Sequence, residues 1–62
     1  MLHIGDRVVD IKNINNLQQD EIRNKVGIIT AINNERASVD FNGQITEFSL
    51  FELIKLSLLI KN

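Results

Sequence analysis

Between Val26 and Leu53 the chain has three apolar runs that are separated by two turn signals. Asn42-Gly43 is the sharper signal, because a two-residue type I′ turn needs positive φ at both central positions. The second signal, Asn33-Asn34, follows a β-branched run and predicts a second hairpin. We therefore predict a meander of three antiparallel strands in this stretch.

The two-residue turn fixes which side chains of the last hairpin share a face. The predicted cross-strand pairs are Phe41 with Gln44, Val39 with Thr46 and Ala37 with Phe48. In this register Ile45 faces outward, which makes it a candidate contact residue. The alternative is a β-bulge that would turn Ile45 inward and Phe48 outward. We favour the first arrangement, because Phe48 buries more apolar area than Ile45 would regain.

The segments before the meander predict one more strand and a long connection. Gly5–Lys12 is interpreted as the first strand, in which Val8 and Val9 face opposite sides at the corner of a barrel. The polar stretch 13–25 is longer than a hairpin loop, and it is interpreted either as a single helical turn anchored by Leu17 or as a flexible loop. Gly27 indicates a bulge or a close approach of two backbones near the start of the next strand.

After the meander, Ser49 and Glu52 have the spacing of a capping box and predict one turn of 3₁₀ helix. Residues 54–61 then alternate with period two, which predicts a last strand with Leu58 inside. Leu59 interrupts this alternation by facing outward. The alternative interpretation is a single helix over 49–60.

Composition limits the classes of protein to consider. The chain has 62 residues, 44% of them hydrophobic and 24% charged, and it contains no cysteine. This indicates one small globular domain over residues 1–62, without disulfides or thiolate metal sites. No apolar run is long enough to span a membrane and no leader pattern is present, so we expect a cytoplasmic protein without membrane attachment. The net charge of −1 argues against electrostatically driven binding of nucleic acid.

Five short strands with no second layer of helices predict an all-β fold, a small five-stranded barrel with one short 3₁₀ turn near its C-terminus. The chain resembles the SH3-like barrels of bacterial proteins, KOW-type domains among them. The residues that carry this resemblance are Gly5-Asp6-Arg7-Val8, Lys25-Val26-Gly27-Ile28-Ile29 with Ile32, Val39-Asp40-Phe41-Asn42-Gly43 and Phe48–Leu53. The resemblance is specific for architecture and weak for function.

KOW-type domains imply an alternative function, association with RNA or DNA in transcription or translation. The basic residues that match this role are Arg7, Lys12, Arg23 and Lys25, although acidic residues are interspersed with them. Stacking of bases would need phenylalanine, because Tyr and Trp are absent, and we expect all three Phe in the core.

No constellation of residues predicts catalysis. The plasmid-encoded dihydrofolate reductases also begin their barrel with Gly-Asp-Arg-Val, but their Val-Gln-Ile-Tyr strand is matched here only by Gln44-Ile45. His3 is the single histidine and lies near a terminus. We therefore expect no enzyme activity, no cofactor and no metal.

The sequence thus predicts a small non-catalytic binding or regulatory module that acts through protein–protein contacts, such as a phage- or plasmid-encoded accessory protein. Either a protein partner or a second copy of the chain is the expected ligand. The candidate binding residues are Leu17, Arg23, Lys25, Ile45 and Leu59.

Overall fold

The computed structural model describes residues 1–14 and 24–59, and these residues form an all-β fold of five antiparallel strands. The strands are β1 (Arg7–Asp10), β2 (Gly27–Asn33), β3 (Arg36–Phe41), β4 (Gln44–Ser49) and β5 (Leu53–Lys55). The helical segments are the 3₁₀ helices η1 (Ile11–Asn13) and η2 (Leu50–Glu52) and the short helix α2 (Leu56–Leu59). The predicted fold class, including the 3₁₀ turn near the C-terminus, is confirmed.

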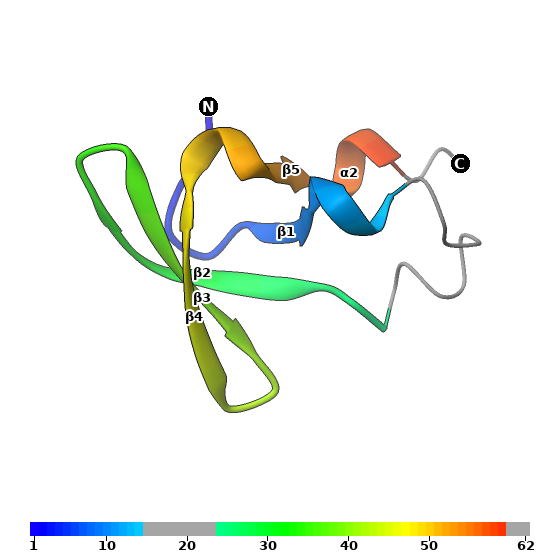
Figure 1. Ribbon diagram of the computed structural model, residues 1–62, viewed down its shortest axis with the longest axis horizontal. Coiled ribbons are helices and arrows are strands. Elements are labelled where there is room, and N and C mark those ends of the chain that lie inside the picture. Colours follow the sequence, from blue (N-terminus) through cyan, green and yellow to red (C-terminus); the bar gives the residue numbers. More distant parts are fainter. Residues whose placement is uncertain (15–23, 60–62) are drawn as a thin grey trace.

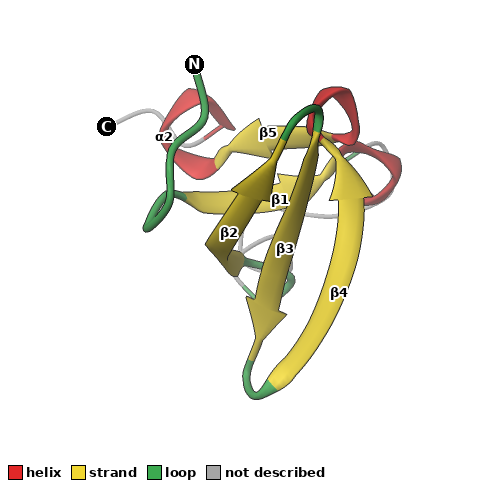
Figure 2. Ribbon diagram, turned by 90° about the vertical axis from the view of Figure 1, so that its left-hand side faces the viewer, coloured by secondary structure: helices red, strands yellow, loops and turns green. Residues whose placement is uncertain are grey.

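The strands form one sheet in the order β4-β3-β2-β1-β5. The sheet is strongly bent, so that β1 and β5 run across β3 and β4 in Figures 1 and 2. This bend encloses the core between the two arms of the sheet. It also brings η2, β5, α2 and the N-terminus together at the top of Figure 1.

The β3–β4 hairpin has the predicted turn and the predicted register. Asn42 and Gly43 have φ values of 54° and 97°, as a type I′ turn requires. The Asp40 carboxylate accepts the Gly43 N–H at 2.6 Å and so supports the turn from the side. The pairs are Phe41 with Gln44, Val39 with Thr46 and Ala37 with Phe48. Ile45 therefore faces outward, and the alternative with a bulge in this hairpin is wrong.

The core is small and aliphatic, with an aromatic pair at its margin. Its buried members are Val8, Ile29, Ala37, Val39 and Leu53. Phe41 and Phe48 are partly buried and pack against them, with ring centroids 5.9 Å apart in an edge-to-face arrangement. Val9 is also fully buried but lies outside this cluster, so adjacent residues of β1 are covered on opposite faces, as predicted.

Gly27 marks a position where side chains of β3 pack against the backbone of β2, and neither a bulge nor a close approach of two backbones. A Cβ atom at this position would overlap Val39 Cγ1 and lie 2.8 Å from Phe41 Cε1. The bulge of β2 lies two residues later, between Ile29 and Ala31. The turn into β3 is also displaced by one residue from the predicted Asn33-Asn34, because Asn33 still pairs with Arg36 and Asn34 takes the positive φ of 59°.

Two predicted strands are shorter than expected. β1 ends at Asp10, because the Asp10 carboxylate accepts the Lys12 N–H at 3.0 Å and caps the first turn of η1. The predicted strand over 54–61 ends at Lys55, where pairing with β1 ends. Beyond this point the backbone forms α2, whose hydrogen bonds are local. The alternative of a single helix over 49–60 is also wrong, because β5 separates η2 from α2.

Candidate functional site

The predicted binding residues do not form one site. Leu17 and Arg23 lie outside the described residues. Lys25 is exposed in the turn before β2, and Ile45 is exposed on β4. Leu59 is half-buried in α2, so the prediction of an outward-facing residue in a strand is wrong. Figures 1 and 2 both place α2 far from the hairpin end of β4, where Ile45 lies.

An apolar groove of about 410 Å³ lies where η2, β5, α2 and the N-terminal segment meet. It is lined by Met1, Leu2, Leu50, Phe51, Leu53, Lys55 and Leu58. Three of these side chains are mainly in solvent, since Met1 is fully exposed, Phe51 is 79% exposed and Leu58 is 66% exposed. A cluster of exposed large apolar side chains around a concavity is typical of an interaction site.

Phe51 is the feature of this groove that our sequence analysis missed. We expected all three Phe in the core, and for Phe51 this is wrong. Successive residues of a 3₁₀ turn point in different directions, so η2 cannot bury both of its first two residues. Leu50 packs against the core and Phe51 is left facing the solvent. Leu58, which we predicted inside, is exposed because α2 replaces the expected strand.

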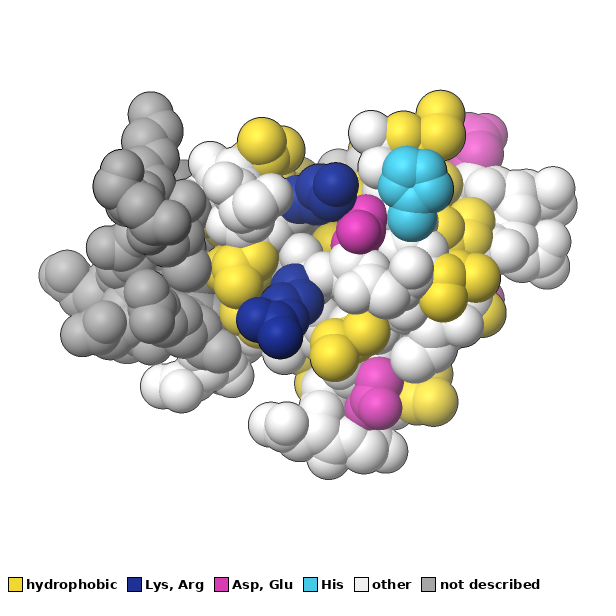
Figure 3. Space-filling model, turned by 180° about the vertical axis from the view of Figure 1, so that it is seen from behind, with side chains coloured by type: hydrophobic (Ala, Val, Ile, Leu, Met, Phe, Trp, Pro, Cys, Tyr) yellow, Lys and Arg dark blue, Asp and Glu magenta, His cyan; other side chains and the backbone are white. Residues whose placement is uncertain are grey.

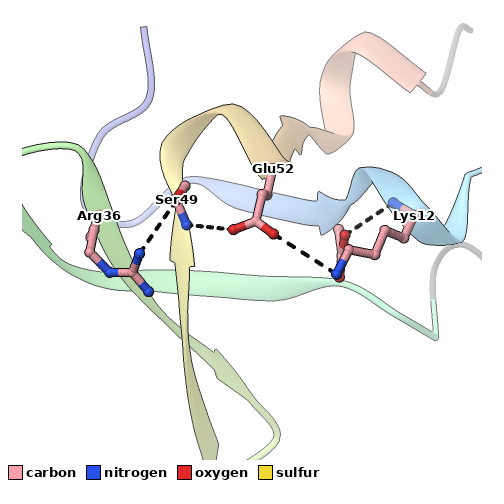
Figure 4. A network of polar contacts seen from close by, with 5 residues as sticks. Lys12, Arg36, Ser49 and Glu52 are labelled. Carbon is pink, nitrogen blue, oxygen red and sulfur yellow. Dashed lines mark hydrogen bonds and ion pairs between the residues drawn. The ribbon is translucent and has the colours of Figure 1, made fainter.

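A polar network holds η2 and thereby sets the position of Phe51 (Figure 4). The Ser49 N–H donates to Glu52 Oε1 at 2.8 Å, as the predicted capping box requires. The other carboxylate oxygen of Glu52 lies 3.9 Å from Lys12 Nζ. On the opposite side, Arg36 donates to the Ser49 hydroxyl at 3.4 Å and pairs with Glu47 at 3.1 Å. The turn is therefore tied to η1, β3 and β4 at once.

The titratable side chains nearest to the groove have structural roles. Asp6 Oδ2 accepts the His3 N–H at 2.7 Å and closes the turn at Gly5, where φ is 94°. The same oxygen lies 3.7 Å from Lys55 Nζ and 3.9 Å from His3 Nδ1. Figure 3 shows the histidine beside an acidic and a basic side chain on this face. Within residues 1–14 and 24–59, no group of three His, Cys, Asp or Glu residues is arranged to hold a metal ion.

Three basic side chains of the described residues are paired with acidic ones. Lys12, Arg36 and Lys55 each lie within ion-pair distance of a carboxylate. This pairing lowers the positive potential that the phosphates of a nucleic acid would meet. Among the described residues, no helix has the length and hydropathy that a membrane span needs.

Comparisons of the chain with protein families, with curated proteins and with solved structures give no match. The resemblance to SH3-like barrels of the KOW type therefore stays a prediction, and so do the expected lack of enzyme activity, lack of a cofactor and cytoplasmic location.

Proposed function

We propose that this protein is a small non-catalytic binding module that docks a protein partner in the apolar groove formed by Met1, Leu2, Leu50, Phe51, Leu53 and Leu58. The observation that carries the proposal is the exposure of Phe51 at the rim of this concavity. Leaving an aromatic ring in water gives up roughly 1.5 to 3 kcal/mol that burial would return. A partner that covers the ring recovers this free energy.

The chemistry of the groove defines the kind of partner. Its lining is apolar except for Lys55, and the Lys55 ammonium lies beside Asp6. A matching partner segment therefore presents apolar side chains to the groove, and needs no strong charge. Aromatic anchors at the centre of an interface carry a large share of binding free energy, typically 2 kcal/mol or more.

The fold supports such a contact without rearrangement. Phe51 belongs to a turn that the Ser49–Glu52 hydrogen bond and the Lys12 and Arg36 contacts already hold in place. Binding to a preorganised turn does not have to order that segment, so more of the contact free energy appears as affinity.

The experiment is affinity capture from the native cell, followed by a measurement of affinity for the purified partner. Phe51→Ser should weaken binding by about 30-fold or more, the equivalent of about 2 kcal/mol. The matched control is Ile45→Ser, which removes another largely exposed apolar side chain, from β4 and remote from the groove, and should leave affinity unchanged. Equal binding by wild type and Phe51→Ser would refute the groove as the docking site. Capture that disappears after nuclease treatment would point to RNA or DNA instead.

A further inference from the structure

A second surface lies on the outer face of the sheet, where one side chain from each of four neighbouring strands forms a continuous row. The register pairs Arg7 with Ile28, Ile28 with Asp40 and Asp40 with Ile45. Residues that pair directly across an antiparallel ladder lie on the same face. This outer row therefore runs from β1 to β4 in the order basic, apolar, acidic, apolar.

The apolar members of the outer row are exposed although they belong to strands that also build the core. Ile28 is 46% exposed and Ile45 is 62% exposed, whereas Ile29 and Val39, which follow Ile28 on β2 and precede Asp40 on β3, are fully buried on the inner face. Figure 3 shows a face on which hydrophobic side chains lie beside both basic and acidic ones. The row therefore contains both charged and apolar side chains, and the order of its charges restricts which surface can bind to it.

The two charges of the row do not neutralise each other within one chain. Adjacent strands are about 4.8 Å apart, so Arg7 and Asp40, two strands apart, have backbones about 10 Å apart with Ile28 between them. Neither side chain forms an ion pair with another residue of the ranges 1–14 and 24–59. Asp40 uses Oδ1 to accept the Gly43 N–H, and its second oxygen can accept from a further donor.

We propose that the outer row binds a second copy of this chain, with a two-fold axis that runs parallel to β2 and passes over Ile28. This operation places Ile28 against Ile28 of the second copy. It places Arg7 against Asp40 of the second copy, and Asp40 against that copy's Arg7. The contact is isologous, so one row supplies both halves of each ion pair.

The lengths and charges of the side chains favour this arrangement over its alternative. Packed sheets lie about 10 Å apart, and a long Arg side chain opposite a short Asp side chain spans this distance. The two-fold axis repeats the same contact on the other side of Ile28. The guanidinium can donate two parallel hydrogen bonds to the carboxylate. A two-fold axis perpendicular to the strands would instead place Arg7 against Arg7 and Asp40 against Asp40, which is repulsive. The order of charges therefore selects one relative orientation.

The expected association is weak, because a row of four side chains on a convex sheet covers less than the roughly 800 Å² per partner of a standard interface. Sedimentation should therefore be measured from about 10 µM to about 1 mM protein. Wild type should shift from monomer to dimer in this range. A wild type that stays monomeric up to about 1 mM would overturn the proposal.

Charge reversal gives the decisive test. Arg7→Asp alone and Asp40→Arg alone each create two like-charge contacts in a homodimer, so each should weaken self-association by at least about tenfold. An equimolar mixture of the two variants should form a heterodimer, since both of its contacts again join opposite charges. Mixed variants that stay monomeric while wild type dimerises would refute the pairing.

Asp40→Asn separates loss of the ion pair from damage to the hairpin turn, because it removes the charge while the amide oxygen can still accept the Gly43 N–H. This variant should keep the melting temperature close to that of wild type and still weaken self-association. The controls are Lys25→Asp and Glu35→Arg, which make the same charge changes in exposed turns outside the row and should dimerise like wild type. Dimerisation that Phe51→Ser abolishes and Arg7→Asp leaves intact would assign self-association to the groove and overturn the outer row.

Discussion

Replacing Gly27 by alanine tests how closely the side chains of β3 pack against the backbone of the neighbouring strand β2. Gly27 is buried in β2, and a Cβ atom there would overlap Val39 Cγ1 and lie 2.8 Å from Phe41 Cε1. Real Cβ contacts are longer than 3.0 Å, so at least one neighbour must move. Val39 is fully buried and cannot move into open space.

The magnitude follows from the cost of overpacking a core, about 1 to 3 kcal/mol for an added methyl group that has no room. A chain of 62 residues has a total stability of about 3 to 9 kcal/mol, taking about 0.05 to 0.15 kcal/mol per residue. Gly27→Ala should therefore remove a large share of the stability and lower the melting temperature by roughly 5 to 20 °C.

The assay is urea unfolding of wild type, Gly27→Ala, Val39→Ala and the double variant. Val39→Ala alone destabilises by leaving a cavity, but in the double variant it removes the atom that the new methyl group would overlap. The two changes should therefore couple, with a combined loss smaller than the sum by about 1 kcal/mol. A Gly27→Ala variant as stable as wild type, or strictly additive losses, would refute the close approach.

Three further predictions concern the turns and the surface. Gly43→Val should destabilise by about 1 to 2 kcal/mol through strain at φ 97° alone, since no atom lies within 4 Å of the added Cβ; an unchanged melting curve would contradict the type I′ turn. Phe51→Ser should change the free energy of unfolding by less than about 0.5 kcal/mol, because the ring is 79% exposed, and a larger loss in urea unfolding would give Phe51 a structural role. Any binding of nucleic acid should be weak and should fall steeply with added salt, and a sub-micromolar complex insensitive to salt would contradict this.

The β3–β4 hairpin could be predicted residue by residue because its determinants are local. Asn42-Gly43 selects the turn type, and the turn then fixes every cross-strand pair up to Ala37 with Phe48. The outward position of Ile45 followed from the same register. The capping box at Ser49 and Glu52 is equally local, and it correctly located η2.

The C-terminal segment could not be predicted in the same way, because its conformation depends on a distant strand. Residues 56–58 fit the alternation of a strand, but β1 provides no pairing beyond Lys55, and Leu56–Leu59 forms α2 instead. The groove was not predicted for the same reason, since Leu58 is exposed because this segment forms α2 in place of the expected strand. A signal for Phe51 was present in the sequence: it lies next to Leu50 in a predicted 3₁₀ turn, which has room to bury one of the two.

Site-specific photocrosslinking in the native cell would show whether the groove at Phe51 docks a protein partner. A photoreactive phenylalanine analogue would replace Phe51, and in a control protein Gln44, which is exposed at the hairpin end of β4. We predict a discrete adduct from position 51 that survives nuclease and is degraded by protease, with none of the same mass from position 44. No adduct from position 51, or the same adduct from both positions, would contradict the proposed docking site.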